Sequence, residues 1–178
     1  MIENTTNMQT LDEFMQKHPD MPKRKVIDRL DLILSKDVAE KILSGEKTIE
    51  FRSRSPLYNA RLIQMDIYDW GIKAKNKGEI TDEEFFAFAL PTVPVNSIHF
   101  HNYVNTWYLD IEVNYHDLAI LRKSFLTSLH ECHNCHELDR PIDEIEKAIE
   151  TGTIQEKDRP ALFFFALGNV LGANLPIN

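Results

Sequence analysis

The sequence is poor in cysteine and in long apolar runs. Its two cysteines, Cys132 and Cys135, are too few and too close together for the disulfide framework of a small secreted protein. No apolar run reaches the roughly 18–20 residues that cross a bilayer. Glu3 and Asn4 stand where a signal peptide would carry basic and apolar residues. We therefore expect a cytoplasmic protein with no membrane partner.

An excess of basic charge is also missing, since the formal net charge is −8. This argues against a general duplex-DNA binder, because non-specific affinity depends on basic side chains that neutralise phosphates. The acidic residues concentrate in 137–158, which hold eight acids and three bases, whereas basic residues gather earlier, around 23–25, 47–61 and 73–77. A chain polarised in this way can still meet a phosphate chain along its basic edge.

The remaining composition is that of an ordinary globular protein, with 43% hydrophobic and 27% charged residues. The length suits one domain with a sizeable core. We expect an N-terminal extension at residues 1–24, with a short helix capped by Thr10, and a single domain at residues 25–178.

Local patterns predict the remaining elements. Alternating apolar residues indicate strands at 26–34 and 61–70 and a hairpin at 97–113, with a loop at 53–59. A capping box at Thr81 and Glu84 predicts a helix that Pro91 stops, and further helices are expected at 118–129 and 141–150.

The most informative stretch is Gly45-Glu46-Lys47-Thr48-Ile49-Glu50-Phe51-Arg52. It closes a helix that Ser35 can cap, since Gly45 supplies the left-handed residue with which helices often end. A strand follows. Ile49 and Phe51 point to one face and Glu50 and Arg52 to the other, because side chains alternate along a strand. Taken alone, these charges favour a solvated ion-pair face that contributes about 0–1 kcal/mol.

The run from Ile42 to Arg52 resembles the signature of the ASCH domain, a small member of the PUA-like superfamily. That signature is Gly-x-Lys-x-x-Glu-x-Arg after a helix, and its spacing is intact here. The likeness extends to an apolar closing strand at 160–168 and more loosely to 101–103. It implies an α+β fold, a PUA-like, mostly antiparallel β-barrel with flanking helices. The family also implies a cleft beside the signature, in which RNA or a modified nucleobase binds.

The resemblance leaves two classes of function open, and the favoured one is binding. In that class Lys47 and Arg52 meet a phosphate or a base edge, while Glu50 accepts a hydrogen bond from an exocyclic amine. Trp70 beside nearby lysines adds a combination typical of single-stranded nucleic-acid sites, although lysines in charged loops are more often solubility devices, which is the favoured interpretation of these lysines. The residues expected to bind are Lys47, Glu50, Arg52, Arg54, Trp70, Lys73 and Tyr103.

The alternative is a small amidohydrolase that acts on an acylated nucleoside such as N4-acetylcytidine, with Lys47 and Glu50 in the active site. Enzymes similar to the ASCH family use a lysine at the Lys47 position as base, a threonine at the Glu50 position as nucleophile, and a further glutamate. This chain has the lysine but not the threonine, and Glu50 beside Lys47 favours the ammonium form, which is a weaker base. Thr48 is out of register with that nucleophile. Glu50 could instead orient a water, with Lys47 or Arg52 stabilising the oxyanion.

A second unusual stretch is His130-Glu131-Cys132-His133-Asn134-Cys135-His136. Zinc sites usually combine two separated ligand pairs, and only one pair is present. We therefore predict no metal and no cofactor, with zinc bound by Cys132, Cys135, His130 and His136 as the alternative. If no metal binds, the stretch is interpreted as the C-terminal end of a helix, whose histidines interact with the helix dipole.

Overall fold

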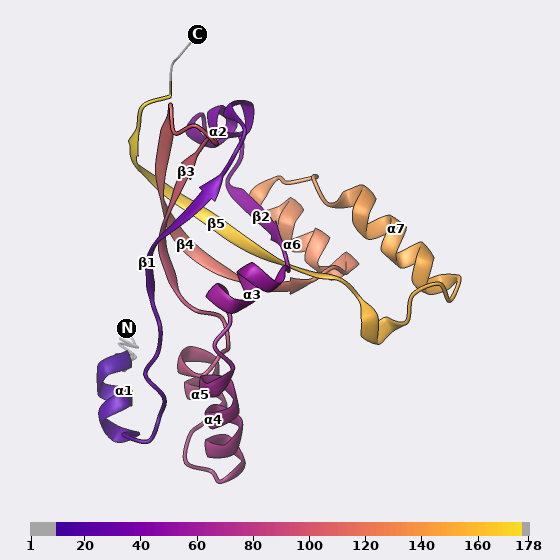
Figure 1. Ribbon diagram of the computed structural model, residues 1–178. Helices are drawn as coiled ribbons and strands as arrows, with labels where there is room; N and C mark the ends of the chain where they lie inside the picture. The colour runs from indigo at the N-terminus through magenta and orange to yellow at the C-terminus, as the bar shows by residue number, and fades with distance from the viewer. Residues whose placement is uncertain (1–9, 176–178) are drawn as a thin grey trace, which may run out of the picture. The chain divides into compact units, whose positions relative to one another are not determined.

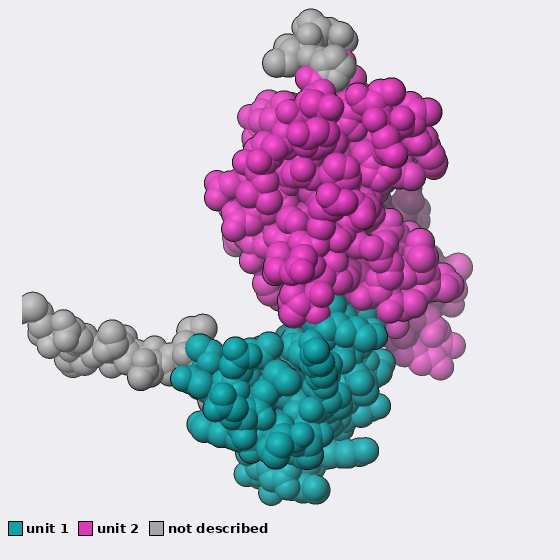
Figure 2. Space-filling view, turned by 60° about the vertical axis from the view of Figure 1, so that its left-hand side comes forward, with its two compact units in different colours: residues 1–25, 63–93 teal, residues 26–62, 94–178 magenta. Residues whose placement is uncertain are grey.

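Seven α-helices and five strands form the described part of the computed structural model, residues 10–175 (Figure 1). They divide into two compact units, one made by residues up to Lys25 with Ile63–Val93, the other by Val26–Leu62 with the chain from Pro94 onward (Figure 2). Residues 1–9 of the expected extension lie outside the described residues. The domain boundary after residue 24 stays a prediction, while the structure groups residues 10–25 with 63–93.

The larger unit contains a five-stranded mixed sheet, so the α+β expectation is confirmed. Three of its four strand pairings are antiparallel, and the pairing of the first and third strands is parallel. In spatial order the strands are β1 (Ile27–Ile33), β3 (Val95–His101), β4 (Tyr108–Ile120), β5 (Ala161–Ala173) and β2 (Ile49–Ser53).

The expected barrel does not close, because β1 and β2 remain the two edges of the sheet. Closure would require backbone hydrogen bonds between these strands. A side chain links them instead: Nη2 of Arg52 donates to the carbonyl of Ile33 at 3.0 Å. Register shifts between Asp110 and Tyr115 interrupt the regular pairing of β4 with β5, and bulges of this kind bend a strand.

The strand expected at 160–168 is present as part of β5, and the signature strand β2 pairs with it in antiparallel fashion. Glu50 lies opposite Phe165 and Arg52 opposite Phe163, so these four side chains share one face of the sheet. Ile49 points to the other face, where it joins a core cluster with α6 (Lys123–His133) and α7 (Asp139–Glu150). Both faces of β5 are therefore covered next to β2, which explains its unbroken apolar sequence.

Three other elements flank this sheet. The helix α2 (Lys36–Leu43) precedes the signature strand and buries Ala39 and Ile42. Ser35 occupies its N-cap position without a side-chain capping bond, and Gly45 takes the expected left-handed conformation with φ of +79°. The helix α3 (Pro56–Leu62) replaces the loop expected at 53–59, and a short 3₁₀ helix, η1 (Glu156–Asp158), leads into β5.

The smaller unit is helical and contains α1 (Leu11–Lys17), α4 (Met65–Asn76) and α5 (Asp82–Phe88). The predicted capping box of α5 is present. The strand predicted at 61–70 is wrong, because α3 and α4 occupy most of it. Ile67, Gly71 and Ala74 are the buried positions of α4, and this spacing of four and three residues is helical. The alternation of Ile63, Met65 and Ile67 therefore does not indicate a strand.

The hairpin predicted at 97–113 is confirmed as β3 and β4. The helix expected at 118–129 begins later, at Lys123, because β4 continues to Ile120 alongside β5. The interpretation of the stretch 130–136 as the C-terminal end of a helix is confirmed, since α6 ends at His133 and Asn134 adopts a left-handed conformation.

Gly71 offers a test of the helical unit. A Cβ atom at this position would lie 2.4 Å from Cβ of Ala89. We expect Gly71→Ala to lower the free energy of unfolding by about 1–3 kcal/mol, because overpacking outweighs the better helix propensity of alanine. Chemical denaturation measures the loss, with exposed Asn76→Ala in the same helix as control. A Gly71→Ala protein as stable as the parent would contradict this packing.

Candidate functional site

Of the charges in the signature stretch, Glu50 is buried and Lys47 and Arg52 are largely buried. The side chain of Glu50 is 6% exposed, that of Lys47 9% and that of Arg52 20%. Nη2 of Arg52 lies 3.1 Å from one carboxylate oxygen of Glu50, and Nζ of Lys47 lies 3.6 Å from the other. The interpretation of these residues as a solvated ion-pair face is therefore wrong. They form a desolvated triad, which we call the signature triad.

Electrostatics within the triad are dominated by its burial. Loss of water raises the pKa of the Glu50 carboxyl, although the positive charges of Arg52 and Lys47 act in the opposite direction. The surroundings are apolar, because the strand partners Phe163 and Phe165 are fully buried. The buried Nε of Arg52 has no hydrogen-bond partner among the described residues.

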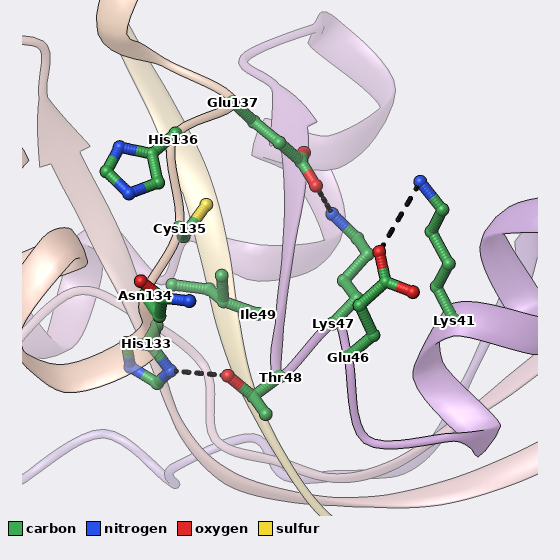
Figure 3. Close-up of a pocket in the computed structure, with 10 residues that line it drawn as sticks. All are labelled: Lys41, Glu46, Lys47, Thr48, Ile49, His133, Asn134, Cys135, His136 and Glu137. Carbon is green, nitrogen blue, oxygen red and sulfur yellow. Dashed lines mark hydrogen bonds and ion pairs between the residues drawn. The ribbon is translucent and has the colours of Figure 1, made fainter.

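A pocket of about 430 Å³ lies between the start of the signature strand and the turn that joins α6 to α7 (Figure 3). The two stretches that the sequence singled out thus meet here, although about 85 residues separate them. Its lining residues are Lys41, Glu46, Lys47, Thr48, Ile49, His133, Asn134, Cys135, His136 and Glu137.

Backbone hydrogen bonds hold both walls of the pocket. On one wall, the amide of Lys47 donates to the carbonyl of Lys41 at 3.0 Å, and the carbonyl of Thr48 accepts from the amide of Leu167 at 2.9 Å. On the other, the chain reverses at Asn134, and the amide of Cys135 returns to the last turns of α6. Both walls are therefore attached to regular elements.

Two polar contacts cross the pocket. The ammonium of Lys47 pairs with the carboxylate of Glu137, and Oγ1 of Thr48 lies 3.0 Å from Nδ1 of His133 (Figure 3). Burial lowers the pKa of His133, which favours a neutral imidazole near pH 7. The pocket thus offers a cation, a carboxylate and a hydroxyl beside a neutral imidazole, which suits hydrogen-bond recognition and proton transfer.

The predicted site residues do not all gather at this pocket. Lys47 lines it, whereas Glu50 and Arg52 lie on the face of β2 opposite to Ile49 and are not among its lining residues. Arg54 is exposed and donates to Asn59. Tyr103 is 86% exposed in the turn between β3 and β4.

Trp70 and Lys73 belong to the helical unit. They lie on α4, so the basic loop expected after a strand is wrong. Nε1 of Trp70 donates to Asp20 at 3.0 Å, and Lys73 is exposed. Their proposed role in stacking and phosphate contact stays a prediction.

The cysteine and histidine stretch does not assemble the four predicted zinc ligands. Among residues 10–175, the cluster suited to a metal consists of His130, His136 and Asp139. Cys132 is exposed and Cys135 is buried in the core cluster beneath α6 and α7. The reversal after α6 brings the two histidines together, because they lie before and after the turn, and leaves the cysteines outside the cluster.

Sequence reasoning missed His133, Glu137 and Asp139 and excluded Thr48. All but Asp139 line the pocket. The sequence marks the two stretches in or beside which these residues lie as unusual, but it does not indicate that the two stretches meet. Comparison with known protein families, with characterised proteins and with solved structures finds no match for this chain. Among the described residues, no helix is both long and apolar enough to cross a membrane.

Proposed function

We propose that the pocket binds a modified nucleobase, either as a free nucleoside or within RNA. The observation that carries this proposal is the convergence of polar groups at a pocket of about 430 Å³, a size within the range of roughly 300–1,000 Å³ typical of small-molecule sites. Ile49 and Cys135 supply buried apolar lining. Lys47 supplies donors and His133 a donor or an acceptor for a base edge, and Glu137 supplies an acceptor for an exocyclic amine.

The family assignment belongs to the same proposal. We place the chain with ASCH and PUA-like proteins of the cytoplasm, with the sheet as an open variant of that barrel. Two features support this placement: the intact spacing of Gly45, Lys47, Glu50 and Arg52 after a helix, and the pairing of their strand with β5. In this proposal the signature triad supports the pocket from the opposite face of β2, since Lys47 belongs to both.

A second function is favoured by the contact between Thr48 and His133. This pair resembles a hydroxyl nucleophile with its base. In an amidohydrolase, Oγ1 of Thr48 would attack the acyl carbonyl and pass its proton to His133, with the ammonium of Lys47 stabilising the oxyanion. His133 would return the proton to the departing amine. Water would then hydrolyse the acyl-threonine ester, releasing the acid and restoring the hydroxyl.

A screen of cytidine, N4-acetylcytidine and short single-stranded RNAs tests the proposal. We expect saturable one-to-one binding of a nucleoside by calorimetry. Glu137→Ala should weaken that binding at least tenfold, because the base loses the carboxylate acceptor that Glu137 supplies to its exocyclic amine. Exposed Glu150→Ala on α7 serves as the matched control. Equal affinities for Glu137→Ala and the parent, or no binding across the panel, would contradict the proposal.

Chromatography of the same mixtures separates binding from hydrolysis. Release of cytidine and acetate from N4-acetylcytidine, abolished by Thr48→Val while binding persists, would establish the second function. Binding without any released cytidine would exclude it for this substrate.

A further inference from the structure

The turn between α6 and α7 brings two imidazoles and a carboxylate together. Nε2 of His130 lies 2.7 Å from one oxygen of Asp139, and Nδ1 of His136 lies 3.0 Å from the other. The centroids of the two rings are 4.3 Å apart. One potential ligand atom from each of the three residues lies within 4.8 Å of the other two.

We propose that His130, His136 and Asp139 form a binding site for a divalent transition metal ion, with Zn²⁺ as the probe. Imidazole nitrogens and a carboxylate oxygen are typical ligands of zinc and of other first-row metals. This site is distinct from the one that the sequence suggested, because it contains no thiolate. It also goes beyond the proposed function and does not depend on it.

The geometry needs little change to accept an ion. Zinc bonds of about 2.0–2.1 Å place tetrahedral ligand atoms roughly 3.4 Å apart. The present contacts of 2.7 and 3.0 Å are hydrogen bonds that a metal ion would replace. Each ring would bind through the nitrogen that now faces Asp139 and carry its proton on the other nitrogen. Around an ion, both contacts to Asp139 would lengthen to roughly 3.4 Å, and any ligand atoms that now lie farther apart than this would move closer together.

The electrostatic surroundings favour a cation on balance. His130 lies in the last turn of α6, where the helix dipole attracts positive charge. Asp139 is the first residue of α7, where the positive end of the helix dipole disfavours a cation. The negative charge of the Asp139 carboxylate offsets this effect. The segment 137–158 contains eight acidic and three basic residues, so the local charge attracts divalent ions.

The site also lies beside the pocket, because His136 lines the pocket and is a proposed ligand. His136 is exposed, which gives an ion access from solvent. Three protein ligands leave at least one coordination position of zinc for water or another small molecule, as in catalytic rather than structural zinc sites.

Calorimetric titration of the chelator-treated, full-length protein with Zn²⁺ tests the site. We expect one equivalent to bind, with Asp139→Asn and His130→Ala each weakening the affinity at least tenfold. His99→Ala is the matched control, because His99 also pairs with an aspartate, Asp110, but that pair is not part of a three-ligand cluster. Circular dichroism verifies that the variants fold. A zinc affinity unaffected by Asp139→Asn, or the absence of one-to-one binding, would overturn the proposal.

Substitution with Co²⁺ separates this site from a thiolate site. We expect a cobalt spectrum without a thiolate charge-transfer band, unchanged by Cys132→Ser. A thiolate band that disappears in Cys132→Ser would refute the His130, His136 and Asp139 set in favour of cysteine ligation.

Discussion

Replacing Lys47 with methionine is expected to lower the free energy of unfolding by about 3 kcal/mol at pH 7. The side chain of Lys47 is 9% exposed, and its ammonium lies between the carboxylates of Glu50 and Glu137. Without Lys47, the buried carboxylate of Glu50 keeps Arg52 at 3.1 Å but loses its second counter-charge, which makes its burial more costly. The buried Glu50 accounts for most of this loss, since Glu137 is half exposed and hydrated.

The destabilisation of Lys47→Met should shrink on acidification. Burial already raises the pKa of Glu50, and loss of Lys47 removes a charge that lowers it. The native variant then holds a proton on Glu50 that the unfolded chain, with an ordinary pKa near 4.3, releases. The free energy of unfolding of Lys47→Met therefore falls as pH rises from the pKa of Glu50 in the unfolded chain through its raised pKa in the native variant. It recovers as pH drops from 7 toward about 4.5.

Denaturant titrations from pH 4.5 to 7.5 measure both effects. The control is Lys41→Met, which changes an exposed lysine of the same pocket that is paired with exposed Glu46. It should alter stability by less than about 0.5 kcal/mol. A Lys47→Met protein with no loss, or with a loss independent of pH, would show that the lysine is not coupled to Glu50.

Arg52→Met is expected to cost about 3–5 kcal/mol, because Arg52 is the closest counter-charge of Glu50 at 3.1 Å. The backbone carbonyl of Ile33 also loses a donor, but this residue is exposed and water can replace the bond. The loss should therefore come mainly from the buried carboxylate of Glu50, which keeps only the more distant ammonium of Lys47 at 3.6 Å.

The double variant Glu50→Leu/Arg52→Met isolates that contribution. Both positions lie opposite fully buried phenylalanines, Phe165 and Phe163, so apolar side chains of similar volume suit the site. The double variant should regain at least about 2 kcal/mol relative to Arg52→Met. Exposed Arg54→Met serves as control, with a change below about 0.5 kcal/mol. A double variant less stable than Arg52→Met would contradict the account of the triad.

The sequence predicts those parts of the fold that depend on local chemistry. The end of α2 at Gly45, the alternation of Ile49 and Glu50, and the capping box at Thr81 each follow from a few neighbouring residues. The same reasoning failed at 61–70. There a short apolar alternation is compatible with a strand as well as with a helix. The helix packs through Gly71 against Ala89, and this tertiary contact cannot be predicted from the neighbouring residues.

The candidate site depends on contacts between distant residues, so only one side of it could be predicted. Lys47 was identified through its spacing to Gly45, but nothing local indicates that Glu137 pairs with it or that Thr48 meets His133. Burial was also unpredictable. A carboxylate and a guanidinium on one strand face are usually solvated, and only the packing of β5 beside them shows otherwise.

We propose that the pocket between the signature strand and the turn after α6 binds a modified nucleobase. Titration of ¹⁵N-labelled protein with N4-acetylcytidine, followed by amide chemical shifts, tests it most directly. We expect saturable shifts at Lys47, Thr48 and Asn134, from both walls of the pocket, without comparable shifts at exposed Tyr103. Shifts confined to residues outside the pocket, or none at saturating nucleoside, would contradict it.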